Sequence, residues 1–221
     1  MTIRFRNRAE AGQQLARRLT HYANRHEVLV LALPRGGVPV AYEVAAALNA
    51  PLDIFVVRKL GLPGHEELAM GAIASGGMRV LNGSVIEDLH ISDGVIDSVA
   101  AKELRELERR ERSYRDDLAR PEVEGRTVIL VDEGIATGSS MRLAIEALRQ
   151  LRAGRIVVAA PTAALSIVRE LRTEADEVVA VITPATFQDV GQWYSDSTQP
   201  TDDEVRAFLE EAGQIRTAMM S

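Results

Sequence analysis

Short apolar runs alternate with helix-compatible segments along most of this chain of 221 residues. A continuous apolar run of strand length is typical of a strand that is buried on both faces of a parallel sheet. Runs of this kind occupy residues 28–33, 53–57, 127–131, 155–160 and 177–182, and helix-compatible segments occupy residues 8–22, 38–48, 141–151, 165–172 and 202–212. The alternation predicts an α/β fold in which helices flank a doubly wound, mostly parallel sheet.

The alternation is interrupted at residues 60–122, which predicts a segment inserted into a single domain spanning residues 1–221. Two apolar stretches flank the glycines at 76–77, which suits a hairpin turn because glycine tolerates positive φ. The charged residues 93–118 predict a long helix with a thin apolar stripe. We expect the insertion to form a flap or hood with this helix, and residues 184–221 to form a small C-terminal hood and a helix.

Composition argues against several classes of function. The net charge of −6 disfavours general nucleic-acid binding, which needs a broad basic surface. No apolar stretch approaches the length of a membrane span, and the first residues lack the apolar run of a signal peptide. The absence of cysteine excludes disulfides and zinc–thiolate sites. We therefore expect a cytoplasmic protein that acts on small molecules rather than on nucleic acids or membranes.

The segment from Val128 to Met141 carries the strongest chemical signal. An apolar strand leads into the carboxylates of Asp132 and Glu133, and a small loop then opens a helix. Carboxylates at this position can accept hydrogen bonds from sugar hydroxyls and can stabilise positive charge on a ribose ring. The free N–H groups and the dipole at a helix N-terminus favour a phosphate, and Gly138 allows close approach. Open α/β sheets bind their ligands at this edge.

This segment resembles the signature of the type I phosphoribosyltransferases, which is an apolar strand, two acidic residues, three small or apolar residues and Thr-Gly. The resemblance covers about residues 28–185 and is closest to bacterial phosphoribosyltransferase-domain proteins of unassigned substrate. It implies that Asp132 and Glu133 are the catalytic pair, holding the ribose 2′- and 3′-hydroxyls of 5-phosphoribosyl 1-diphosphate. The residues it assigns to the 5′-phosphate are Ala136, Thr137, Gly138, Ser139 and Ser140, and those it assigns to the diphosphate are Arg35, Gly36, Gly37, Arg58 and Lys59.

The reaction that the resemblance implies is transfer of ribose 5-phosphate to a nitrogenous base, with release of diphosphate. Such a reaction consists mostly of positioning and preorganised electrostatics. The family's Mg²⁺ would be bound mainly through the substrate's oxygens and water rather than by a cage of protein ligands. Many relatives are dimers, so the resemblance also implies a homodimer.

The acceptor stays open at this stage. Family members that act on 6-oxopurines usually carry Asp where this chain has Ala136, which disfavours a 6-oxopurine acceptor. Trp193 is a candidate stacking face for a planar base. Two other functions are compatible with the same motifs. One is a non-enzymatic regulatory protein that binds the donor or a nucleotide, and the other is a hydrolase or phosphorylase acting on phosphoribosyl compounds.

Overall fold

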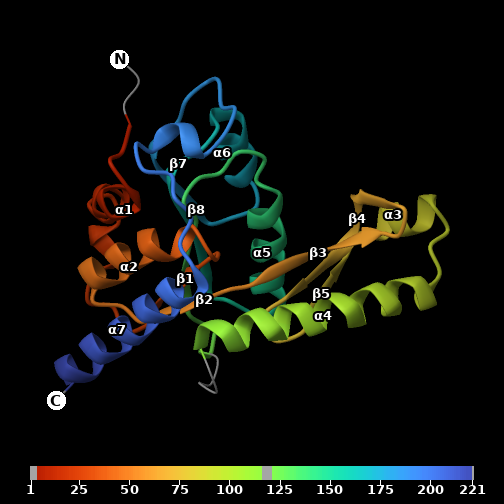
Figure 1. Ribbon diagram of the computed structural model, residues 1–221, viewed down its shortest axis with the longest axis horizontal. Helices are drawn as coiled ribbons and strands as arrows, with labels where there is room; N and C mark the ends of the chain where they lie inside the picture. The colour runs from red at the N-terminus through yellow and green to blue at the C-terminus, as the bar shows by residue number, and fades with distance from the viewer. Residues whose placement is uncertain (1–3, 116–120, 221) are drawn as a thin grey trace.

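A five-stranded parallel sheet forms the centre of the protein in the computed structural model, which describes residues 4–115 and 121–220. The strand order is β2-β1-β6-β7-β8, and each neighbouring pair is parallel. The strands are β1 (Val28–Ala32), β2 (Leu52–Ile54), β6 (Thr127–Val131), β7 (Arg155–Thr162) and β8 (Glu177–Ile182). The predicted fold class is confirmed (Figure 1).

Helices cover both faces of this sheet because alternate residues of each strand point to opposite sides. Val28 and Val30 pack into one apolar cluster, whereas Leu29 and Leu31 pack into the other. The first face carries α1 (Arg8–Ala16), α2 (Gly37–Leu48) and α7 (Asp202–Met220), and the second carries α5 (Ser139–Gln150) and α6 (Leu165–Leu171). Figure 1 shows the two groups on opposite sides of the strands.

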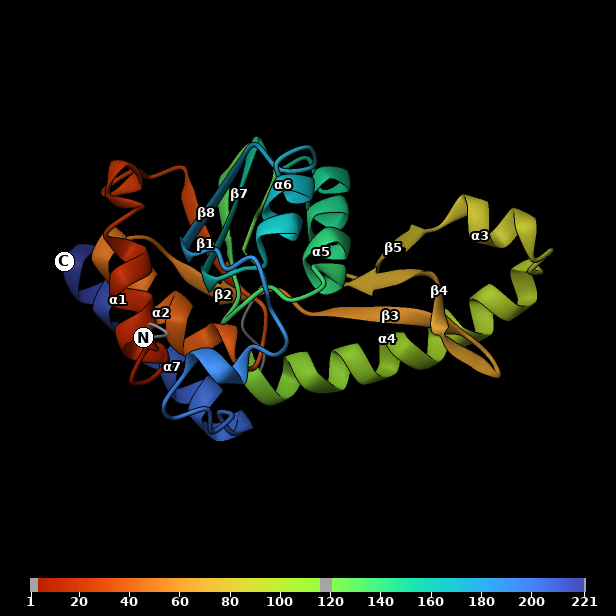
Figure 2. The ribbon, with the colours of Figure 1, turned by 90° about the horizontal axis from the view of Figure 1, so that it is seen from above.

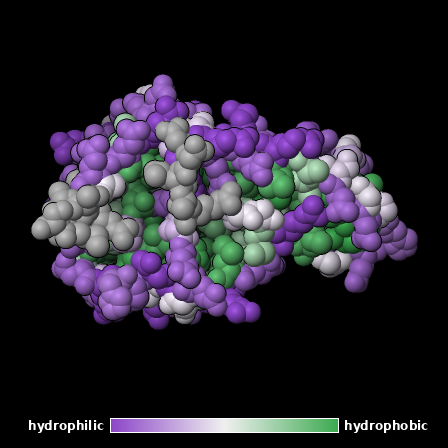
Figure 3. Space-filling view, turned by 90° about the horizontal axis from the view of Figure 1, so that it is seen from below, coloured by the Kyte–Doolittle hydropathy of each residue, from purple (hydrophilic) through white to green (hydrophobic). Residues whose placement is uncertain are grey.

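The inserted segment forms an arm that projects from the central sheet (Figures 1 and 2). Its antiparallel sheet has the order β3-β4-β5 and lies along the long helix α4. The arm consists of β3 (Val57–Leu62), β4 (His65–Ala74), β5 (Met78–Leu81), α3 (Gly83–Asp88) and α4 (Asp93–Arg115). Hydrophobic surface is visible on the arm in the view from below (Figure 3), and its most exposed large apolar side chains are Leu68, Leu81 and Leu89.

The prediction of one strand at residues 53–57 is wrong, because two strands in different sheets share this stretch. β2 ends at Ile54, and β3 begins at Val57 in the other sheet. Phe55 and Val56 between them are apolar and buried, so the apolar pattern continues through the break. The predicted basic pair after the second strand therefore lies inside an antiparallel strand instead of at the end of a parallel one.

The remaining helix predictions differ from the structure mainly in their ends. The helix expected at 8–22 ends at Ala16, and a separate 3₁₀ turn follows at Thr20–Tyr22. The final helix extends beyond the predicted residue 212 to Met220. The predicted end of the long helix, at 116–118, lies outside the described residues. Within the described part of the chain, no helix is both long enough and apolar enough to cross a membrane.

Candidate functional site

The turns that follow β1 and β6 lie side by side at the carboxyl edge of the central sheet. β1 and β6 are neighbours, and the Leu33 N–H donates to the Val131 carbonyl at 2.9 Å. The helix after β1 covers one face of the sheet and the helix after β6 covers the other. This is a topological switch point, where open α/β sheets bind their ligands.

Two glycines allow the first turn to contact the second. A Cβ atom built on Gly36 would lie 2.1 Å from Cδ of Glu133, and one built on Gly37 would lie 2.9 Å from the Val131 carbonyl oxygen. A larger residue at position 37 would meet the backbone of the second turn, and one at position 36 would displace the Glu133 carboxylate. The peptide bond between Pro34 and Arg35 is cis.

The side chain of Glu133 is held by the two ends of the chain. The Arg8 Nε donates to Glu133 Oε2 at 2.6 Å, and the Gln199 amide donates to Oε1 at 2.9 Å. The Tyr194 hydroxyl donates to the Glu133 carbonyl at 2.5 Å. Arg8 is only 7% exposed and also donates to the Thr198 carbonyl at 2.6 Å. The carboxylate of Glu133 is thus paired within the protein.

Asp132 has different surroundings. Its Oδ1 accepts a hydrogen bond from the Glu133 N–H at 2.7 Å. The pKa of Asp132 is raised to about 7, chiefly by burial and also by the charge of Glu133, although the Glu133 N–H and the Arg8 guanidinium act to lower it. The carboxyl group therefore changes its charge near neutral pH.

The predicted phosphate turn lies at the N-terminus of α5. Gly138 is the N-cap residue with a φ of 74°, a conformation that favours glycine. Thr137 Oγ1 lies 3.2 Å from Ser139 Oγ, in an exposed hydrogen bond. The Thr137 carbonyl accepts from Arg142 at 3.1 Å, which fixes the turn against the helix. Exposed hydroxyls beside a helix N-terminus can bind an anion.

A cavity of about 90 Å³ connects these parts. It is lined by Leu33, Pro34, Phe55, Val56, Val57, Arg110, Asp132 and Ser140. Asp132 and Ser140 were predicted site residues. Arg110, from the inserted helix, was not predicted, and neither was the contact of Arg8 with Glu133.

Arg58 and Lys59, which were predicted to bind the diphosphate, lie outside the cavity of Asp132. Arg58 lies 2.5 Å from Glu103 in an ion pair between β3 and α4. Arg58 and Lys59 line a separate cavity of about 640 Å³, together with Lys102 and Arg105 of α4. The structure therefore does not bring this basic pair into the cavity of Asp132.

Trp193 lies in the core instead of presenting the predicted stacking face. Its side chain is buried in a cluster with Phe5, Ala11 and Tyr194 where the two ends of the chain meet. The Phe187 ring packs 5.9 Å from it, between centroids. The prediction is corrected to a packing role, because these neighbours cover the indole and leave it 6% exposed.

Comparisons with known proteins agree with this geometry. The profile of the phosphoribosyl transferase domain matches residues 5–192. A relative from Mycobacterium tuberculosis H37Rv, named "Putative phosphoribosyl transferase Rv0571c", is 48% identical over 208 residues, covering 94% of this chain and 47% of the relative. The chain thus spans about half the length of the curated relatives it matches. The crystal structure of TT1426 from Thermus thermophilus is similar, with a TM-score of 0.84, 40% identity, and coverage of 95% of this chain and 99% of the other.

Proposed function

This chain belongs to the phosphoribosyl transferase domain family, and from that premise we propose that it transfers ribose 5-phosphate from 5-phosphoribosyl 1-diphosphate to a nitrogenous base. In this reaction the bond from ribose C1′ to diphosphate breaks, and a bond from C1′ to an acceptor nitrogen forms. One observation carries the proposal. A carboxylate, a helix N-terminus with hydroxyls and a glycine-rich turn converge at the switch point of the sheet.

Each part of the site has a role in this proposal. The carboxylate of Asp132 accepts hydrogen bonds from ribose hydroxyls and stabilises the positive charge that develops on the ring. Residues 136–140 bind the 5′-phosphate through N–H groups and hydroxyls. Arg35 and the glycines after it bind the diphosphate. Arg35 lies 3.6 Å from Asp202, and both side chains are about half exposed, so the guanidinium is free to turn toward a ligand.

Glu133 has a supporting role in the proposal. Its carboxylate oxygens are already paired with Arg8 and Gln199, whereas Asp132 lines the cavity. We therefore assign the direct contact with ribose to Asp132. Glu133 fixes the turn and anchors the ends of the chain. The diphosphate role of Arg58 and Lys59 stays a prediction.

Mg²⁺ fits this site as a partner of the donor. Among the described residues, no group of three or more His, Cys, Asp or Glu side chains could hold a metal ion. A cation would therefore be held by diphosphate oxygens and water, with Asp132 as the nearby carboxylate. When bound, it would neutralise charge on the leaving diphosphate.

Turnover can be measured by ³¹P NMR with 5-phosphoribosyl 1-diphosphate, Mg²⁺ and a panel of purine and pyrimidine bases. The proposal expects diphosphate release that requires one of the bases and is lost in Asp132→Asn. Donor binding with no turnover by any base would contradict the transferase and favour a regulatory protein. Base-independent release of ribose 5-phosphate would favour a hydrolase.

A further inference from the structure

The C-terminal end of α4 is fixed against the central domain. Arg115 donates to the Ile54 carbonyl at 3.1 Å and to the Asp53 carboxylate at 3.2 Å. Tyr114 is buried, and the Ser113 carbonyl accepts from Arg206 of α7 at 2.9 Å. These contacts hold the last turns of the inserted helix in place beside the site.

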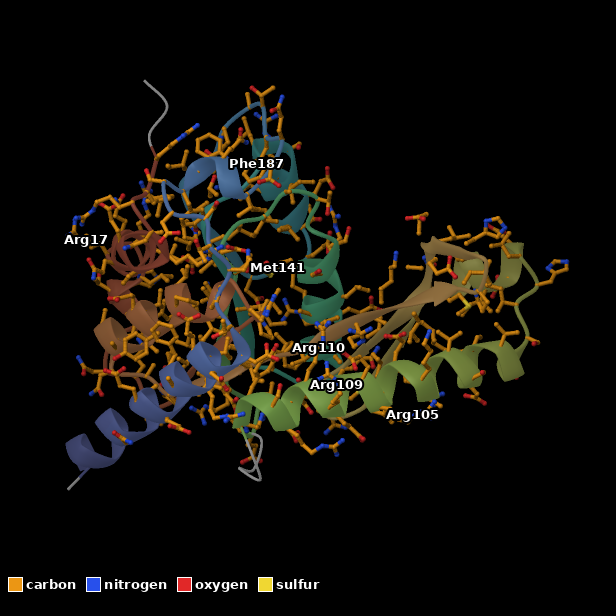
Figure 4. The ribbon with its side chains drawn as sticks, in the orientation of Figure 1. Arg17, Arg105, Arg109, Arg110, Met141 and Phe187 are labelled. Carbon is orange, nitrogen blue, oxygen red and sulfur yellow. The ribbon has the colours of Figure 1, made fainter. Side chains whose placement is uncertain are left out.

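Arg110 lies one turn before this anchor and lines the cavity of Asp132 and Ser140. Figure 4 shows it on the side of α4 toward α5, with Arg105 farther out along the arm. The Arg110 Nε donates to Glu106 at 3.1 Å. Within the described part of the chain, its terminal nitrogens have no protein acceptor. They are therefore available to a ligand in the cavity.

The charge around Arg110 favours an anion. Glu106 accepts hydrogen bonds from both Arg109 and Arg110, which lower its pKa to about 2 and keep it ionised. Glu106 pairs with two guanidinium groups and so does not neutralise both of them, although Asp202 also attracts Arg109 and the Asp132 carboxyl group borders the same cavity. Arg109 uses both Nε and Nη2 on Glu106, at 2.8 and 2.9 Å, and does not line the cavity.

We propose that Arg110 binds a phosphate group of the donor, so that the inserted arm supplies part of the donor site. The inference rests on the proposed function. A guanidinium group matches a phosphate because its planar donors form two parallel charge-assisted hydrogen bonds. Glu106 orients Arg110 without neutralising the pair of arginines.

Calorimetric titration of Arg110→Gln and Arg109→Gln with 5-phosphoribosyl 1-diphosphate and Mg²⁺ tests the inference. Arg109 is the matched control because it shares Glu106 and the same helix. We expect Arg110→Gln to weaken binding by about ten- to a hundredfold, the usual range for a hydrogen bond to a charged group. Arg109→Gln should change it by about twofold or less, as expected for an exposed charge pair. Thermal denaturation should show both variants folded.

Titrations with diphosphate alone and with ribose 5-phosphate alone identify the phosphate group that Arg110 contacts. The affinity of Arg110→Gln should fall for one of these ligands and stay near the wild-type value for the other. If the wild-type protein binds the donor and the two variants bind it with equal affinity, the inference is overturned and the proposed function stands. A wild-type protein that binds no donor would overturn both.

Discussion

At the residue scale, the adjacent carboxylates of Asp132 and Glu133 have different partners. Glu133 is paired with Arg8 and Gln199, while Asp132 borders the cavity and has a raised pKa. Successive residues at the end of a strand point to different sides, so Glu133 faces the packed chain ends and Asp132 faces the cavity. The acidic pair of the motif therefore divides into a residue paired within the protein and a residue that faces the cavity.

Replacing Arg8 tests this division. Arg8→Ala leaves the nearly buried Glu133 carboxylate without its cation, and removal of one partner of such a pair costs about 3–5 kcal/mol. We expect a matching loss in the free energy of unfolding in urea. Arg6→Ala is the control, because its side chain is 79% exposed and its ion pair with Glu10 is on the surface. A loss in Arg8→Ala no larger than that of Arg6→Ala would contradict the buried role of Arg8.

The raised pKa of Asp132 predicts opposite pH trends for stability and binding. The folded protein keeps a proton on Asp132 up to about pH 7, whereas the unfolded chain loses it near the ordinary aspartate pKa of 3.8. The folded state binds more protons between these values, so its stability should fall as pH rises from about 4 to 7. Donor binding should strengthen toward pH 7 and above, because the ionised carboxylate accepts the hydroxyl hydrogen bonds.

Asp132→Asn removes this titration and is the variant to compare. The free energy of unfolding of both proteins can be measured in urea from about pH 5 to about pH 8. As pH rises, the wild type should lose stability relative to Asp132→Asn. The rise of donor affinity with pH should be absent in the variant. Parallel stability curves for the two proteins would show that Asp132 has an ordinary pKa.

At the scale of elements, the predictable parts are those whose apolar pattern is unbroken. The strand at 127–131 and the turn after it were predicted where the structure has them. The break between β2 and β3 was missed because Phe55 and Val56 stay apolar and buried across it. Arg8 was missed because it reaches Glu133 from 125 residues away. Arg110 was missed because helix charges usually face solvent, and only the docking of α4 turns this one to the site.

The contact between the two turns at the switch point gives an element-scale prediction. Gly36→Ala places a Cβ atom 2.1 Å from Cδ of Glu133, so the carboxylate must move away from Arg8 or the turns must separate, and crowding of this kind costs about 1–3 kcal/mol. Donor affinity should fall as well. Gly94→Ala in the first turn of α4 is the control, since no atom lies within 4 Å of the added methyl. Urea denaturation should show Gly94→Ala unchanged or more stable by up to about 1 kcal/mol. Equal stability of the two variants would rule out the close approach.

At the scale of the whole molecule, the central sheet and the arm differ in how deeply they are buried. Each residue of β1 is buried, as are four of the five residues of β6, whereas α3 contains no buried residue. The arm joins the central domain through β3, β4 and β5, which contact α5, and through the last turns of α4. The homodimer expected from the family stays a prediction, and light scattering can test it.

Hydrogen exchange followed by mass spectrometry should separate these parts. Amides open through local unfolding at a free energy that rises with burial, so β1 and β6 should exchange slowest and α3 fastest. Donor binding should slow exchange at residues 33–37 and 132–141, where the turns meet the ligand. If Arg110 contacts the donor, peptides covering residues 106–115 should be protected as well, and this protection should be lost in Arg110→Gln but kept in Arg109→Gln. Protection limited to the two turns would confine the donor to the central domain and leave the arm outside the site.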